Sequence, residues 1–270
     1  MKISLFSQSL FALPLLKAID AMKEIGCSSM ELACHPQHLD CKTAREKPGE
    51  IAGYIRKAGI EVSALSLFNK FTDSASLDQE VESAELYISL APLFQTKIVK
   101  VTPGPPSSKD ATERNWQCLA EAVNRLMPVA KKAGVKLAFE THLRHLTDTV
   151  ASSRRLLDMT PPESVGLTVD FLNLAFAGEK MADVVAVLKN RMFHTHLKNG
   201  YIDSEGTWIF QALDKGLVHY PEVIRLLRDA GYTGYLSVEC LGAESETQPV
   251  QTAMKDMQIL KRYLREINEK

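Results

Sequence analysis

The residues best suited to chemistry in this sequence are Glu140, Asp170, His196 and Glu239, because each lies at or near the end of a short apolar stretch. The four stretches read VKLAFE, VGLTVD, MFHTHLK and YLSVE. Short apolar runs of this kind are typical of buried β-strands. In parallel α/β folds the carboxyl ends of the strands lie at one face, so we expect these four side chains to lie close together.

Alternation along each stretch predicts which side chains point inward. Large apolar residues at every second position should face surrounding helices, and the four ionisable residues occupy the opposite face. Buried carboxylates are costly unless they are paired or bound to a cation. Three carboxylates with one imidazole and no thiolate predict one divalent metal ion: Mn²⁺, Mg²⁺ or Co²⁺, with Zn²⁺ as a further option. The predicted site keeps about one net negative charge.

Eight strand-like stretches recur along the chain, and amphipathic helical segments separate them. Strand–helix alternation implies parallel pairing with right-handed crossovers. The predicted strands are Ile3–Phe6, Ser29–Ala33, Val62–Ser66, Ile98–Thr102, Val135–Glu140, Val165–Asp170, Met192–Lys198 and Tyr235–Glu239.

Closure of eight such units predicts an α/β fold with a single (βα)8 TIM barrel over residues 1–270. The alternative is an open, doubly wound sheet, but no G-x-G-x-x-G motif follows the first strand. Gly26 and Gly134 follow helical segments and are expected to end them. Pro128 should kink its helix or cut it short.

Composition excludes some classes of function. The 270 residues carry a formal net charge of -1, so nothing favours nucleic-acid binding. Five cysteines without a C-x-x-C pair suggest reduced thiols and a cytoplasmic protein. Lys2 precedes an apolar stretch that allows a signal peptide, but this stretch also reads as a strand that leads into a helix. No stretch approaches the length of a membrane span, and self-association into a homo-oligomer is left open.

The sequence motifs LAFETH, LTVDFLN, HTHLKN and YLSVE resemble the xylose-isomerase-like barrel superfamily. That group includes sugar and sugar-phosphate isomerases and epimerases, together with inosose and 3-dehydroshikimate dehydratases. The resemblance covers essentially the whole chain and is most specific from Val135 to Glu239.

The resemblance implies roles for individual residues. Glu140, Asp170, His196 and Glu239 match the metal ligands, and Glu140 and Glu239 also match the catalytic acid/base pair. His142 and Lys198 match residues that line the substrate pocket, and Lys198 has the alternative role of pairing with a ligand carboxylate. Asn173 stands where relatives often have a histidine, and asparagine cannot shuttle a proton.

The other histidines and Trp208 are expected to have structural roles or to lie in loops. We expect His194 to be a core histidine or one that supports a ligand, and His35 and His38 to be ordinary loop residues. Trp208 is placed in a long loop after the seventh strand. Endonuclease IV, on the same barrel, needs histidines after its third and fourth strands, but this chain has Leu67–Asn69 and Thr102–Gly104 there.

Three functions remain open from the sequence. The first is a metal-dependent isomerase or epimerase that acts on a small polyol, keto-sugar or sugar phosphate through a metal-stabilised enediolate. The second is a metal-dependent dehydratase of the 3-dehydroshikimate or inosose type. The third is a binding barrel without catalysis.

Overall fold

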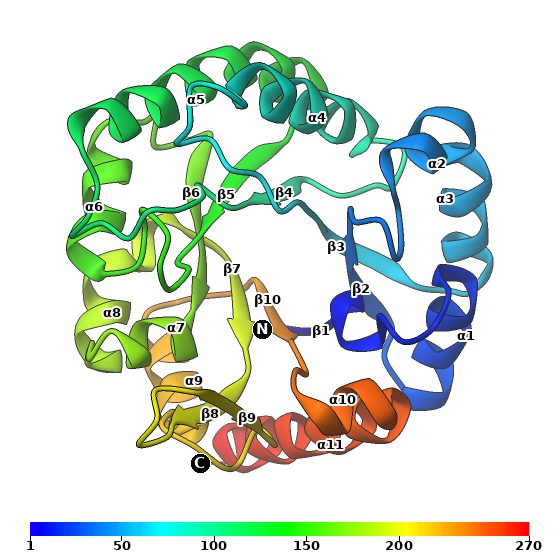
Figure 1. Ribbon diagram of the computed structural model, residues 1–270. Helices are drawn as coiled ribbons and strands as arrows, with labels where there is room; N and C mark the ends of the chain where they lie inside the picture. The colour runs from blue at the N-terminus through cyan, green and yellow to red at the C-terminus, as the bar shows by residue number, and fades with distance from the viewer. Residues whose placement is uncertain (270) are drawn as a thin grey trace.

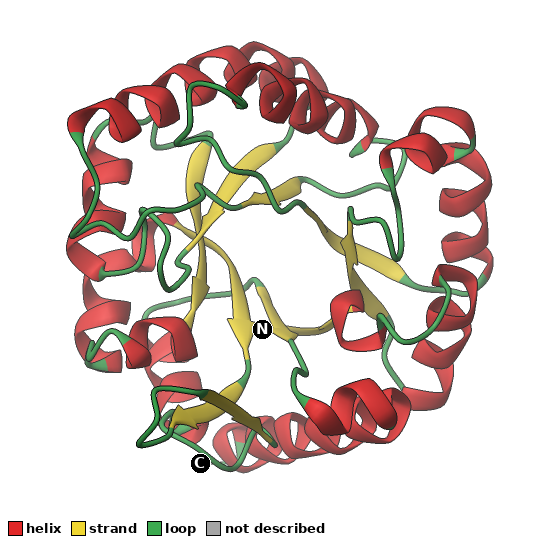
Figure 2. Cartoon of the chain, viewed as in Figure 1, coloured by secondary structure: helices red, strands yellow, loops and turns green. Residues whose placement is uncertain are grey.

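A closed barrel of eight parallel strands forms the centre of the computed structural model, which describes residues 1–269. The strands pair in the order β1-β10-β7-β6-β5-β4-β3-β2, and helices form a ring outside them (Figures 1 and 2). This closure confirms the predicted (βα)8 barrel and excludes an open sheet. The barrel strands are β1 (Lys2–Phe6), β2 (Ser29–Ala33), β3 (Glu61–Ser66), β4 (Ile98–Val101), β5 (Lys136–Glu140), β6 (Val165–Asp170), β7 (Met192–Leu197) and β10 (Tyr235–Val238).

Helices follow the strands and cover the outside of the barrel (Figure 2). Gly26 and Gly134 end α1 and α5 with φ values of 71° and 68°, in the left-handed conformation that glycine adopts without strain. The helices are α1 (Leu15–Ile25), α2 (Cys41–Glu46), α3 (Pro48–Lys57), α4 (Leu77–Leu90), α5 (Glu113–Ala133), α6 (Val150–Asp158), α7 (Phe171–Phe176), α8 (Met181–Leu188), α9 (Tyr220–Asp229), α10 (Ala243–Thr247) and α11 (Pro249–Asn268), with short 3-10 turns at Ser7–Leu10 and Lys189–Arg191.

Two local expectations are wrong. Helix α5 has 21 residues in all and continues past Pro128 to Ala133, so of the two effects predicted for this proline the shortened helix is wrong. Trp208 does not lie in a loop but begins β9 (Trp208–Gln211), which pairs antiparallel with β8 (Asn199–Ile202). This hairpin lies outside the barrel (Figure 1) and contacts α7.

Strand register sets the level of the inward-facing side chains. Asp170 pairs with His196 between β6 and β7, and His196 pairs with Ser237 between β7 and β10. The pairing is irregular at Met30/Glu31 in β2 and at Leu167/Thr168 in β6. Such irregularities change the aim of nearby side chains.

Across residues 1–269, every helix falls short of the length and apolarity that a bilayer crossing requires.

Candidate metal centre

The four side chains that the sequence singled out come together at the carboxyl ends of their strands. His196 Nδ1 lies 3.4 Å from Glu140 Oε1, 3.9 Å from Asp170 Oδ2 and 3.7 Å from Glu239 Oε2. One ligand atom from each of these residues lies within 4.8 Å of all the others. Two ligands of one ion at bond lengths near 2.1 Å lie roughly 3 to 4 Å apart, so the four could hold a single metal ion.

A buried ring nitrogen of this group lacks a hydrogen-bond partner. His196 Nδ1 is enclosed and accepts no hydrogen bond within the described chain. Buried polar atoms are nearly always satisfied, so an orphan aimed at three carboxylates requires an explanation. A metal ion would supply the missing partner, and the oxygen-rich donor set suits a hard or borderline divalent cation.

The two carboxylate oxygens of Asp170 have different partners. Its Oδ1 accepts the backbone N–H of Asn173 at 2.9 Å and so caps α7. Its Oδ2 lies in the cluster, 2.7 Å from Lys198 Nζ. The Asn173 side chain donates to the Thr141 carbonyl at 3.2 Å. The start of α7 therefore holds the aspartate in place.

Two buried lysines are paired with these carboxylates. Lys198 Nζ lies 2.7 Å from Glu239 Oε2 as well as from Asp170, which is the pairing role considered for it. Lys100, on β4, places Nζ 2.9 Å from Glu140 Oε2 and donates to the Leu67 carbonyl at 3.1 Å. Lys100 is fully buried.

The charge balance differs from the one expected from four residues. Besides the three clustered carboxylates, Glu31 on β2 is fully buried and contacts His194 and His196. Four carboxylates against two ammonium groups leave a deficit of two positive charges when the histidines are neutral. With neutral histidines, one divalent cation would neutralise this larger network, whereas the expected residual negative charge counted only the four predicted ligands.

The pKa values of the buried carboxyl and ammonium groups depend on burial and on the charges paired with them. Burial alone would raise the pKa of the Glu140 carboxyl, but Lys100 and His196 outweigh it and hold that pKa well below its ordinary value. Burial raises the pKa of Asp170, and Lys198 only partly opposes this. Burial would lower the pKa of Lys198, yet Asp170 and Glu239 raise it.

The remaining predicted residues lie around the cluster. His142 follows Glu140 by two positions, is partly buried, and stacks on His145 with ring centroids 4.0 Å apart. His194 is fully buried and binds Glu31, as expected for a supporting histidine. His38 is not an ordinary loop residue, because its buried ring contacts Ser7 Oγ and the Leu13 carbonyl.

Sequence reasoning missed Glu31 and Lys100. Both occupy inward positions of apolar strands, SMELA and IVKV, so the alternation rule used for the last four strands would have found them. Tyr220 was missed as well. Its hydroxyl contacts both backbone groups of Lys198, accepting from the N–H at 3.0 Å and donating to the carbonyl at 2.6 Å.

A parallel barrel with a metal-competent acidic cluster at its carboxyl face is an arrangement that many enzymes share. The sequence model of the xylose isomerase-like TIM barrel family matches residues 19–263. The chain therefore belongs to the xylose isomerase-like TIM barrel family.

Curated relatives carry the name inosose dehydratase. The protein from Clostridium perfringens is 27% identical over 163 residues, which covers 55% of this chain and 55% of that protein. The chain thus matches about half the length of that relative. The protein from Geobacillus thermodenitrificans is 27% identical over 285 residues, covering 92% and 93% of the two chains.

Solved structures share the fold at lower identity. A probable 3-DHS dehydratase from Bacillus anthracis has a TM-score of 0.80 at 20% identity, covering 97% of this chain and 99% of the other. A D-tagatose 3-epimerase-like protein has a TM-score of 0.80 at 20% identity, covering 100% and 99%. The IOLI protein, solved with a bound zinc atom, has a TM-score of 0.82 at 17% identity, covering 99% and 98%.

Proposed function

We propose that this protein is a divalent-metal-dependent isomerase or epimerase that moves a proton beside the carbonyl of a small polyol-like ketone. One observation carries the proposal. In the barrel order, Glu140 on β5 and Glu239 after β10 flank the strands of Asp170 and His196 on either side. A substrate above the cluster therefore has a carboxylate on each side of its reacting carbon.

The metal ligands in this proposal are Glu140, Asp170, His196 and Glu239. A divalent ion held there would polarise the substrate carbonyl and stabilise the negative charge that develops when the neighbouring proton leaves. Mn²⁺, Mg²⁺ and Co²⁺ suit the oxygen-rich donors, and Zn²⁺ remains an option.

Proton transfer falls to the two glutamates. One of them removes the proton beside the carbonyl, and the other returns a proton to the opposite face or to the adjacent carbon. Lys100 steadies Glu140 and Lys198 steadies Glu239, which keeps both carboxylates in place. His142 and Asn173, beside the cluster, are proposed to hydrogen-bond substrate hydroxyl groups, and Lys198 to contact the same substrate.

A dehydratase is the second candidate, because the curated relatives are named inosose dehydratase. Removal of the same proton would then be followed by loss of a β-hydroxyl group. The two reactions share the first step and differ in the product.

The test follows proton exchange and product together. The metal-loaded protein is incubated in D₂O with keto-sugars, an inosose and 3-dehydroshikimate, and products are followed by NMR and ultraviolet absorbance. Deuterium beside the carbonyl with an epimer or isomer as product supports the proposal. An absorbing unsaturated product supports the dehydratase, and neither exchange nor product with any substrate contradicts both.

Glu239→Gln is expected to abolish turnover while leaving the fold intact, since the amide cannot accept the proton. Glu222→Gln, an exposed residue on α9, serves as the matched control. Activity near that of the unsubstituted protein in the Glu239 variant would remove Glu239 from the mechanism.

A further inference from the structure

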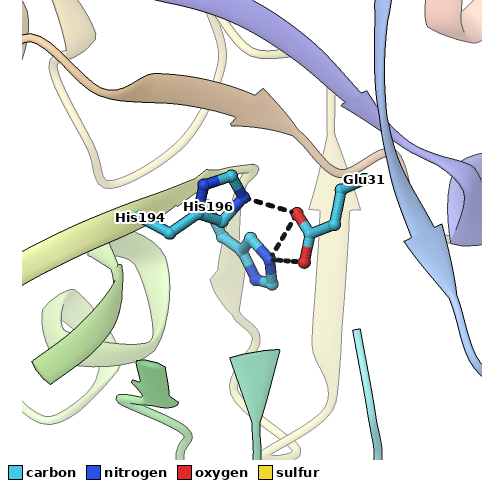
Figure 3. Close-up of side chains that lie close together, drawn as sticks. All are labelled: Glu31, His194 and His196. Carbon is cyan, nitrogen blue, oxygen red and sulfur yellow. Dashed lines mark hydrogen bonds and ion pairs between the residues drawn. The ribbon is translucent and has the colours of Figure 1, made fainter. Parts of the chain in front are cut away.

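A buried carboxylate crosses the barrel interior to reach the metal-facing histidine. Glu31 comes from β2, which is separated from β7 by β1 and β10 in the barrel order. Its Oε1 lies 2.9 Å and its Oε2 3.0 Å from His196 Nε2 (Figure 3). Both residues are fully buried, so water does not compete for this contact.

Two further donors hold the Glu31 carboxylate. His194 Nε2 lies 2.9 Å from Oε2, and Ser237 donates its hydroxyl to the same oxygen at 2.7 Å. Ser237 on β10 pairs with His196 on β7 in the strand register, and His194 lies two residues before His196 on the same strand. The three residues that contact Glu31 therefore come from two neighbouring strands. The glutamate is fixed before any ligand reaches the site.

The contact decides which nitrogen of His196 carries the hydrogen. A carboxylate only accepts hydrogen bonds, so Nε2 must donate to Glu31. In the neutral imidazole, Nδ1 then carries the lone pair, and Nδ1 is the atom that faces Glu140, Asp170 and Glu239. Histidines that bind metals commonly donate their second nitrogen to a carboxylate in this way.

We propose that Glu31, held by His194 and Ser237, is a positioning residue that fixes His196 in its Nε2–H tautomer, so that Nδ1 presents its lone pair to the metal. The inference rests on the proposed metal site and concerns a residue outside the ligand set. Glu31 touches neither the metal nor the substrate, and it acts through the orientation and tautomer of His196.

A competing interpretation is that Glu31, His194 and His196 hold a second metal ion, because their ligand atoms lie close enough together. The hydrogen-bond geometry favours the positioning role. The Nε2 atom of each imidazole already lies at hydrogen-bond distance from the carboxylate, and the Ser237 hydroxyl donates to it as well. The two interpretations differ in the number of ions bound.

The experiment measures Co²⁺ binding to the full chain by its visible absorption. The unsubstituted protein should bind one Co²⁺. Glu31→Gln should bind about 10- to 100-fold more weakly, because the amide can accept from one histidine but must donate toward the other. Glu61→Gln, the same substitution in β3 where the carboxylate pairs with the exposed Lys2, should bind like the unsubstituted protein.

Long-range ¹H–¹⁵N NMR of the Zn²⁺-loaded protein reports the tautomer directly. We expect His196 to show one Nε2–H tautomer with Nδ1 bound to metal, and Glu31→Gln to lose that pattern. Ser237→Ala keeps the charge of Glu31 and removes one of its hydrogen-bond donors, so it distinguishes an effect of positioning from an effect of charge. It also replaces the Glu31 variant in the experiment if that variant does not fold. It should weaken Co²⁺ binding by less than Glu31→Gln does.

The outcomes separate the two proposals. Absence of Co²⁺ binding by the unsubstituted protein overturns the metal site and this inference together. One bound Co²⁺ with unchanged affinity and tautomer in Glu31→Gln and Ser237→Ala overturns the positioning role alone. Two Co²⁺ ions per chain, with the second lost in Glu31→Gln, overturn it in favour of a second metal ion.

Discussion

Lys100 and Glu140 form an ion pair that is almost completely closed to water, with side-chain exposures of 1% and 5%. Removing one partner of a buried pair leaves an uncompensated charge, which typically costs about 3–5 kcal/mol. The lysine ammonium also lies 4.6 Å above the Phe68 ring. The pair therefore combines a stabilising role with placement of a proposed ligand.

We predict that Lys100→Met lowers the free energy of unfolding by about 3–5 kcal/mol in the metal-free protein. Denaturant unfolding measures this. Lys136→Met, on the neighbouring β5 but exposed, is the control and should cost far less. Adding Glu140→Gln to Lys100→Met should recover part of the loss, and a double variant as unstable as Lys100→Met alone would contradict the pairing.

At the scale of residues, the sequence predicts the proposed metal ligands well, but it predicts less well the residues that pair with those ligands. Glu140, Asp170, His196 and Glu239 end recognisable strands, so their type and position together indicate a site. Alternation along IVKV would have placed Lys100 on the inward face, but its pairing with Glu140, 40 positions away, is visible only in the structure. The charge balance could not be obtained without that pairing.

Among the elements, the hairpin β8–β9 depends most on close backbone approach. A Cβ atom on Gly200 would lie 2.1 Å from the Ile209 carbonyl oxygen across the hairpin. Trp208 packs against Phe176 of α7, with ring centroids 5.9 Å apart, and lies under the Arg144 guanidinium at 4.8 Å. The hairpin is thus tied to the segments that follow β5 and β6.

We predict that Gly200→Ala displaces the hairpin and leaves the barrel intact, because the side chain has no space between β8 and β9. Amide hydrogen exchange should increase in β8 and β9 and stay unchanged in β5 and β6. Gly206→Ala, at the hairpin turn, meets no atom within 4 Å but has a φ of 79°, so it tests backbone strain separately. Unchanged exchange in Gly200→Ala would show that the close approach is not needed.

The elements that the sequence predicts are the ones with local signals. Strands β2 and β6 have the expected bounds because apolar alternation begins and ends there. The hairpin carries no such pattern: Tyr201 and Ile202 are exposed, and its pairing arises from tertiary contacts. Pro128 failed to end α5 because flanking residues such as Leu126 and Ala130 are fully buried and hold the helix on the barrel.

For the molecule as a whole, pH acts on stability through Asp256 of α11. This buried carboxyl accepts the Leu213 N–H at 2.9 Å, and burial raises its pKa to about 6. The folded protein holds the proton more tightly than the unfolded chain does. The resulting stability is present at low pH and is lost as pH rises from about 4 to about 6.

We therefore predict that Asp256→Asn removes one component of the pH dependence. Relative to this variant, the unsubstituted protein should lose up to about 3 kcal/mol of unfolding free energy over that interval. Denaturant unfolding at a series of pH values measures the difference. Asp229→Asn, at an exposed site, should leave the profile unchanged; a parallel profile for Asp256→Asn would contradict the assignment.

Metal binding should also stabilise the whole barrel. A cation at one hundred times its dissociation constant adds about 2.7 kcal/mol, provided that it does not bind the unfolded chain. Thermal unfolding with Co²⁺ should shift upward, and a chelator should reverse the shift. Asp170→Asn should respond much less, and an equal response would place the cation elsewhere.

The buried charged network also has a consequence for the order of folding. Six of the eight barrel strands, or the residues directly after them, contribute to it: Glu31, Lys100, Glu140, Asp170, His196 and Glu239. β10 is the last barrel strand in the chain and the one that joins β7 to β1. A chain that has formed its earlier strands but has not docked β10 still lacks Glu239 at the site and an enclosed setting for Glu31. During refolding, the time at which the Co²⁺ absorption appears would therefore report when the barrel closes, and not when its strands form.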